Sequence, residues 1–171
     1  MPTTYVNIST QTLGSTVASV TFSAIPQTYT DLELRMSLRS STGGTAFSSL
    51  QPTFNGATST YSANYFEGNN ATAFAGSFNN QSFFRTDANY AGISTVANDF
   101  SIHEIYIPNY TLTTNKTIMW FDAVNDNNTT QKVLGTAGIF IDTNALTSIT
   151  LTGQFNFVAG STFYLYGIKN S

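Results

Sequence analysis

The chain of 171 residues contains no cysteine, one histidine (His103), and only nine acidic and six basic side chains. Without cysteine, a disulfide framework and a thiolate zinc site are both excluded. Enzymes draw on His, Cys and perturbed pairs of Asp, Glu or Lys to move protons and stabilise charge. Such groups are few and widely spaced here, so the composition argues against an enzyme. We expect no catalytic residue, no metal-ligating residue and no cofactor.

Charge is the largest departure from an ordinary composition, because charged residues make up 9% of this chain and about 25% of an average domain. A net charge of −3 argues against a nucleic-acid partner, which requires a basic surface. Apolar runs stay far below the roughly 18 residues of a membrane-spanning helix, and no signal peptide is visible at the N-terminus. We therefore expect neither nucleic acid nor a membrane as a partner. A surface of hydroxyls and amides suits contact with other proteins or with carbohydrate.

Alternation of apolar and polar residues with a period of two is the dominant local pattern, and it predicts half-buried strands. Residues 31–39 are the best example. One face of that strand carries Leu32, Leu34, Met36 and Leu38, and the other carries Glu33, Arg35, Ser37 and Arg39. Further strands are predicted at residues 16–22, 100–107, 117–124, 132–141, 145–151 and 163–168. The near-continuous apolar run at 117–124 predicts a central strand buried on both faces.

Eight to ten short strands in a chain of this length predict a single all-β domain over residues 1–171, an antiparallel β-sandwich or barrel. A jelly-roll-like sandwich is the preferred variant, and an immunoglobulin-type sandwich is the second. Residues 5–8 form a short strand or belong to an extended N-terminal arm (residues 1–12). Between residues 55 and 92, isolated aromatics among Asn, Gly, Ser and Ala predict some short strands and long loops.

Three possible sites for chemistry are weak. His103 and Glu104 are adjacent on a strand, so their side chains point to opposite faces, and Asp99 or Asp142 would have to approach His103 in space. Residues 122–128 offer several oxygen ligands for Ca²⁺, but a hairpin turn explains the same Asn and Asp residues. A small depolymerase would need paired carboxylates. The acids to test for that role are Glu67, Asp87, Glu104 and Asp122.

Aromatic side chains between residues 61 and 90 are candidates for contact with a partner, because aromatics are enriched in sugar sites and in protein interfaces. Some of them instead anchor loops to the core. The outward face of the 31–39 strand and the N-terminal arm are the other candidate docking surfaces, since extended arms bind neighbours by strand addition. The predicted partner contacts are Tyr5, Tyr61, Tyr65, Phe66, Phe74, Phe78, Arg35 and Arg39.

Four segments resemble small virion proteins of tailed bacteriophages. Residues 146–151 (LTSITL) and 159–168 (AGSTFYLYGI) resemble the C-terminus of that group, and residues 29–34 (YTDLEL) and 103–108 (HEIYIP) resemble its earlier strands. The resemblance implies an all-β structural component of the particle. Within the group such a component is a capsid decoration (cement) protein, or a tail or fibre module. No active-site residue is carried over.

The resemblance also implies partners and a location. The expected partners are the major capsid protein or other virion proteins, and a homo-oligomer is expected, with a trimer favoured. The expected location is the virion, assembled in the cytoplasm of a host bacterium. The favoured function is that of a cement protein that clamps neighbouring capsid subunits. The alternative is a tail or fibre module that binds host-surface glycan through aromatics beside Asn, Asp or Gln.

Overall fold

The computed structural model describes residues 4–41, 47–85, 89–91, 98–125 and 131–169, and these ranges contain twelve strands and no helix. The larger of two sheets contains β1 (Tyr5–Thr12), β3 (Asp31–Leu38), β5 (Tyr61–Asn69), β6 (Thr72–Gln81), β8 (Ser101–Ile107), β9 (Lys116–Asn125), β10 (Gln131–Phe140) and β12 (Thr162–Ile168). The smaller contains β2 (Val17–Phe22), β4 (Phe47–Phe54), β7 (Asn89–Ala91) and β11 (Ile149–Phe157). Within these ranges, accordingly, no helix has the length and hydrophobicity to span a membrane.

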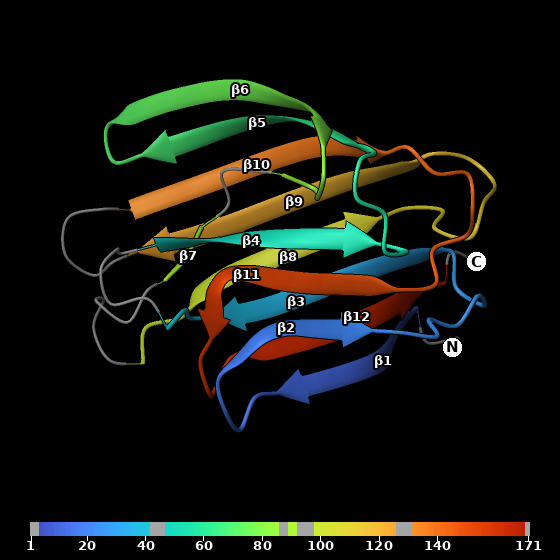
Figure 1. Cartoon of the computed structure of the whole chain (residues 1–171), viewed down its shortest axis with the longest axis horizontal. Coiled ribbons are helices and arrows are strands. Elements are labelled where there is room, and N and C mark those ends of the chain that lie inside the picture. The colour runs from blue at the N-terminus through green and yellow to red at the C-terminus, as the bar shows by residue number, and fades with distance from the viewer. Residues whose placement is uncertain (1–3, 42–46, 86–88, 92–97, 126–130, 170–171) are drawn as a thin grey trace.

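The two sheets pack face to face as an antiparallel β-sandwich (Figure 1). Eight strands follow the order β1-β12-β3-β8-β9-β10-β5-β6, and four follow the order β2-β11-β4-β7. The all-β sandwich predicted from the sequence is confirmed. The jelly-roll variant is not confirmed, because the strands divide eight and four between the sheets.

Residues 5–12 form an edge strand of the larger sheet, and they are not an extended arm. β1 pairs antiparallel with β12, from Tyr5 opposite Ile168 to Thr12 opposite Thr162. Residues 1–3 lie outside the described part of the chain. Residues 61–81 also differ from the prediction of short strands and long loops, because they form one long paired hairpin, β5–β6.

β9 is central in its sheet, as predicted, but the prediction that it is buried on both faces is wrong. Its residues alternate strictly between buried and exposed along the whole strand. Ile118, Trp120 and Val124 point toward the smaller sheet and are buried, whereas Met119 and Phe121 point away from it and are exposed. The reason is that the smaller sheet covers one face of the larger sheet, and no described element covers the other.

The core lies between the sheets and is rich in aromatic rings. The rings of Tyr61 and Phe140 stack at 5.1 Å, and Phe54 lies beside both. The Tyr61 hydroxyl accepts a hydrogen bond from the Phe54 N–H at 2.8 Å and donates to the Ala57 carbonyl at 3.1 Å. Burial raises the pKa of Tyr61 to about 12. Tyr61 is therefore a core residue, and its prediction as a partner contact is wrong.

Four strands cannot cover eight, so the β5–β6 hairpin extends beyond the smaller sheet. Figure 1 shows β5 and β6 along one side of the molecule, past β4. The consequence is visible in β6, where Phe74 remains 50% exposed although its neighbour across the strand pair is the buried Glu67. This overhang leaves β6 as an edge strand of the larger sheet.

Candidate functional site

Six large apolar side chains stand on the outer face of the eight-stranded sheet, the face directed away from the smaller sheet. We call this group the apolar stripe. Its members are between 36% and 66% exposed. They are Phe66, Ile102, Met119, Phe121, Val133 and Ile139.

The strand register joins these side chains into a continuous surface. Phe121 of β9 is opposite Gly135 of β10, and Gly135 is opposite Phe66 of β5. A Cβ atom at Gly135 would clash with the rings of Phe66 and Phe121, so both rings lie across the glycine. A second row runs from Ile102 to Val133, with Ala123 between them. The two rows are two residues apart along each strand, or about 7 Å, a separation that aromatic and long side chains can bridge.

No charged residue occupies an outward position on the three strands at the centre of the stripe. The outward residues of β9, β10 and β5 are Thr117, Met119, Phe121, Ala123, Asn125, Gln131, Val133, Gly135, Ala137, Ile139, Ser62, Asn64, Phe66 and Gly68. An antiparallel sheet with one solvated face normally alternates apolar inward and polar outward residues. A contiguous exposed apolar patch instead marks a site of interaction.

A cluster of tyrosines lies on the same outer face, over β1, β12 and β3. Arg35 is central to this tyrosine cluster, with its guanidinium 5.9 Å from the ring centroids of both Tyr5 and Tyr166. Its Nε also pairs with the buried carboxylate of Glu33. The hydrogen bonds to Glu33 raise the pKa of Arg35 and of Tyr5. Two predicted partner contacts, Tyr5 and Arg35, are thus brought together on one surface.

A shallow groove of about 620 Å³ lies between the tyrosine cluster and the apolar stripe. Its walls include Arg35 and Tyr166 on one side and Ile102 on the other, with Glu104 between them. Glu104 is directly opposite Phe121 on the next strand. The outer face therefore has an uncharged apolar centre and a rim with charges of both signs.

The structure separates the predicted partner contacts into groups. Tyr5, Arg35 and Phe66 are on the outer face, and Tyr61 is in the core. Tyr65, Phe74 and Phe78 are on the inner face of the β5–β6 overhang, where the rings of Tyr65 and Phe78 stack at 5.3 Å. Arg39 follows the end of β3, where its main-chain N–H donates to Ser161 Oγ at 3.3 Å.

Most of the apolar stripe was missed by sequence reasoning. Met119 and Phe121 were predicted to be buried, because a nearly continuous apolar run suggests cover on both sides. Ile102, Val133 and Ile139 were placed in strands without an assigned face. The sequence did contain a signal, because the apolar residues of 116–125 alternate between two faces. Ile118, Trp120 and Val124 are on one face, and Met119 and Phe121 are on the other. Which of the two faces is exposed depends on whether a second sheet covers one side or both sides of the strand.

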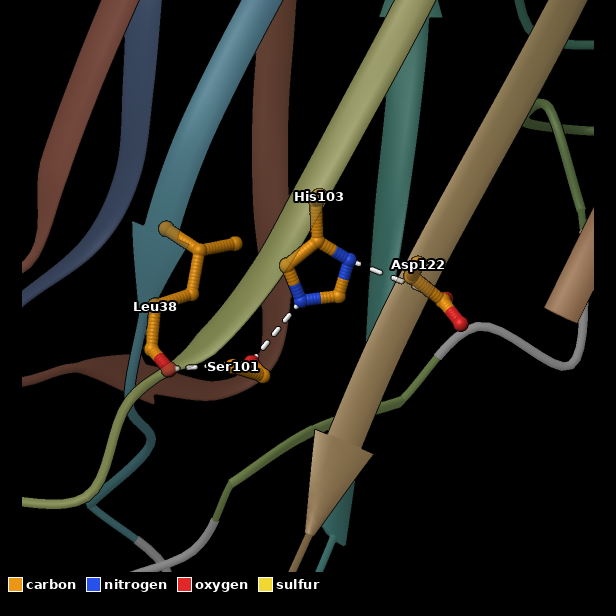
Figure 2. A network of polar contacts seen from close by, with 4 residues as sticks. All are labelled: Leu38, Ser101, His103 and Asp122. Carbon is orange, nitrogen blue, oxygen red and sulfur yellow. Dashed lines mark hydrogen bonds and ion pairs between the residues drawn. The ribbon is translucent and has the colours of Figure 1, made fainter. Parts of the chain in front are cut away.

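The inner face of β8 and β9 holds a buried polar network, shown in Figure 2. The Ser101 hydroxyl donates to the Leu38 carbonyl at 3.0 Å and lies 2.9 Å from His103 Nε2. With the hydroxyl proton used in this way, Nε2–H of His103 donates to Ser101, and Nδ1 faces Asp122 Oδ2 at 3.7 Å. This tautomer is assigned from the hydrogen bonds.

The environment of this network favours its neutral forms. Burial lowers the pKa of His103 to about 3. Burial also raises the pKa of Asp122 well above its ordinary value, and the nearby Glu67 raises it further. Both shifts favour the uncharged forms, a neutral imidazole on His103 and a protonated carboxyl on Asp122.

The Ser–His–Asp order of contacts is that of a hydrolase triad, but the surroundings do not suit that chemistry. Ser101, His103 and Asp122 are each 5% exposed or less, and a nucleophile must reach its substrate. The network is accordingly part of the core. The acid facing His103 is Asp122 rather than Asp99 or Asp142. Glu104 points to the opposite face, as predicted.

The remaining acids do not form a ligand set in the described part of the chain. Glu67 Oε1 lies 3.0 Å from Lys132 Nζ and is buried, and Asp87 is outside the described residues. Of the predicted calcium stretch, Asp122 points into the core, and Asp126, Asn127 and Asn128 lie outside the described residues. No group of three or more His, Asp or Glu within the described ranges is placed to hold a metal ion.

Comparisons of the chain with protein-family models, with curated proteins and with solved structures find no match.

Proposed function

We propose that this chain is a non-enzymatic structural component of a phage virion, most specifically a capsid decoration (cement) protein that contacts neighbouring capsid subunits through its outer face. The observation that carries the proposal is the apolar stripe, an uncharged surface of large side chains on a sheet that is otherwise well packed. The resemblance of four segments to small virion proteins supplies the class of partner.

The composition of the outer face supports a role in assembly. Interface cores are depleted of charged residues and enriched in aromatic residues and Met, whereas interface rims are polar. Phe66, Met119 and Phe121 have the composition of an interface core, and Arg35 and Glu104 have that of a polar rim. Leaving the stripe in water is unfavourable by about 25 cal/mol for each Å² of apolar surface, so attachment to a shell stabilises both partners.

The test is sedimentation of purified protein with capsids that lack it. The wild-type chain is expected to bind saturably at a fixed ratio to the shell subunits. The double variant Phe121→Ser with Ile102→Ser removes two members of the stripe, and its binding is expected to fall by at least ten-fold, since truncation of a central interface residue commonly costs more than 1 kcal/mol.

A matched control removes one exposed aromatic and one exposed aliphatic side chain elsewhere. Phe155 on β11 is 40% exposed and Leu112 is 49% exposed, against 45% for Phe121 and 66% for Ile102. The double variant Phe155→Ser with Leu112→Ser is expected to bind capsids as the wild type does. If both double variants bind equally well, the outer face is not the contact surface. If the wild-type chain does not bind capsids, the capsid is not its partner.

A second candidate is a tail or fibre module that binds host-surface glycan. It is favoured by one observation, the Tyr65–Phe78 stack on the overhang, where the Arg85 guanidinium lies 4.5 Å from the Phe78 ring centroid. Aromatic rings with a nearby polar group are typical of surfaces that are apolar on one side and wet on the other. Retention of the protein on host cells, without binding to capsids, would establish this candidate instead.

A further inference from the structure

β6 forms one free edge of the eight-stranded sheet, and it lacks the usual protection of an edge strand. Natural edge strands are kept from pairing by charged residues, proline, bulges or short length. β6 has ten residues, TAFAGSFNNQ, with no charge and no proline. Its register with β5 is regular over seven successive pairs, from Asn69–Thr72 to Ala63–Phe78, and the irregularity lies only beyond them.

The opposite edge of the same sheet is different. β1 is interrupted near its centre by a register shift between Asn7 and Ser9. The Asn7 amide also donates to Thr10 Oγ1 at 3.0 Å, which ties the strand locally to itself. A bulge of this kind bends an edge and breaks its hydrogen-bonding pattern. Of the two edges, β6 alone offers a long regular row of backbone groups.

The sequence of β6 is complementary to itself when reversed. Phe74-Ala75-Gly76-Ser77-Phe78 is nearly palindromic about Gly76. In an antiparallel pair of two copies centred on Gly76, Phe74 of each copy is opposite Phe78 of the other, and Ala75 is opposite Ser77. Directly opposed aromatic pairs stabilise a sheet, and like charges, which would destabilise it, are absent from this strand.

Side-chain positions in the monomer fit this pairing. Phe74, Gly76 and Phe78 are opposite Glu67, Tyr65 and Ala63 of β5, so they share the inner face of the overhang. The Tyr65 ring fills the space above Gly76 and stacks on Phe78. Phe74 has no such cover and is 50% exposed. The Phe78 ring of a second copy would cover it.

We propose that two copies of this chain associate about a two-fold axis at Gly76, joining their β6 edges into one continuous sheet. The contact is isologous, so the same strand serves both copies, and main-chain hydrogen bonds supply its affinity as in other strand additions. The two-fold axis is perpendicular to the sheet, so both outer faces point the same way. The inference does not rest on the proposed function, although such a dimer would present two apolar stripes to one partner surface.

The experiment is sedimentation velocity of the full chain over a concentration series, with charges placed at opposed positions. In the double variant Ala75→Lys with Ser77→Lys, the introduced lysines face each other twice across the axis, and the dimer is expected to weaken by about ten-fold or more. In the double variant Ala75→Lys with Ser77→Glu, each lysine faces a glutamate, and the dimer is expected to return.

Controls separate this contact from loss of folding and from other contacts. Both double variants change the same two exposed positions, so thermal unfolding should be alike while self-association differs. The double variant Thr10→Lys with Thr12→Lys, on the β1 edge, is expected to leave the dimer intact. A wild type that stays monomeric at the highest concentration, a dimer that is unaffected by the two lysines, or a trimer or open-ended series would overturn the proposal.

Discussion

The buried His103–Asp122 pair predicts a pH dependence of stability that a single substitution reveals. His103 has a pKa of about 3 in the folded chain against an ordinary value of 6.5, so its contribution to stability is present above pH 6.5 and is lost as the pH falls toward 3. Asp122 has a raised pKa, so its contribution is present below its ordinary value of 3.8 and is lost as the pH rises. Between these ordinary values the two effects have opposite signs, and they cancel while the folded Asp122 keeps its proton.

The cancellation can be counted in protons. While Asp122 keeps its proton, the folded pair holds one proton. At pH 5 the unfolded pair also holds one, on His103. Unfolding then leaves the number of bound protons unchanged, so this pair adds no pH dependence to the free energy of unfolding. The variant Asp122→Asn keeps a neutral group beside His103 Nδ1 and leaves the histidine uncompensated. Its stability should fall by about 1.4 kcal/mol per pH unit below 6.5, or about 2 kcal/mol at pH 5.

The assay is urea unfolding at pH 7, 6 and 5, followed by the fluorescence of the one tryptophan, Trp120, which is buried and lies 6.1 Å from the His103 ring. Other carboxylates titrate in the wild type and in the variant, so the quantity to compare is the difference between the two. The companion variant His103→Gln should change in the opposite direction and gain stability toward pH 5. Parallel slopes in the wild type and in Asp122→Asn would refute the neutral pair.

Two further changes test the packing. Leu34→Ala removes a fully buried side chain of β3 and should lower the free energy of unfolding, measured in urea, by about 2–5 kcal/mol. Ile102→Ala, on the exposed face of the next strand, should change that free energy little. Equal effects of the two substitutions would contradict the assigned faces. Deletion of residues 1–12 removes β1 with its half-buried Val6 and Ile8, and should lower stability by about 2 kcal/mol without loss of the sandwich. An unchanged urea midpoint would show that this segment behaves as an arm.

The sequence predicted strands well where one face is apolar and the other is polar. In β3 the period of two placed Leu32, Leu34 and Met36 inward, and all three are buried. The same period placed Glu33 on the face that meets water or a partner, yet Glu33 is only 2% exposed. Arg35 of the same strand and Tyr5 of a strand distant in sequence bind its carboxylate. Such cover depends on strand order, which local periodicity does not contain.

The candidate site was less accessible to sequence reasoning, for two physical reasons. Periodicity in β9 separates two apolar faces but does not say how many layers the fold has, so Phe121 was predicted to be buried. The partner of His103 depends on the register that sets it opposite Asp122, and neither the pairing of β8 with β9 nor its offset follows from composition. Phe66 was identified because aromatics are enriched at interfaces, a preference that holds without knowledge of the fold. Arg35 was identified from the outward face of the 31–39 strand, and Tyr5 from the predicted N-terminal arm.

Gly135 determines how the two phenylalanine rings at the centre of the outer face are placed. Because this residue has no side chain, the rings of Phe66 and Phe121 occupy the space that a Cβ atom would need. Any larger residue at this position would lift both rings together, so the contour of the surface is coupled across three strands.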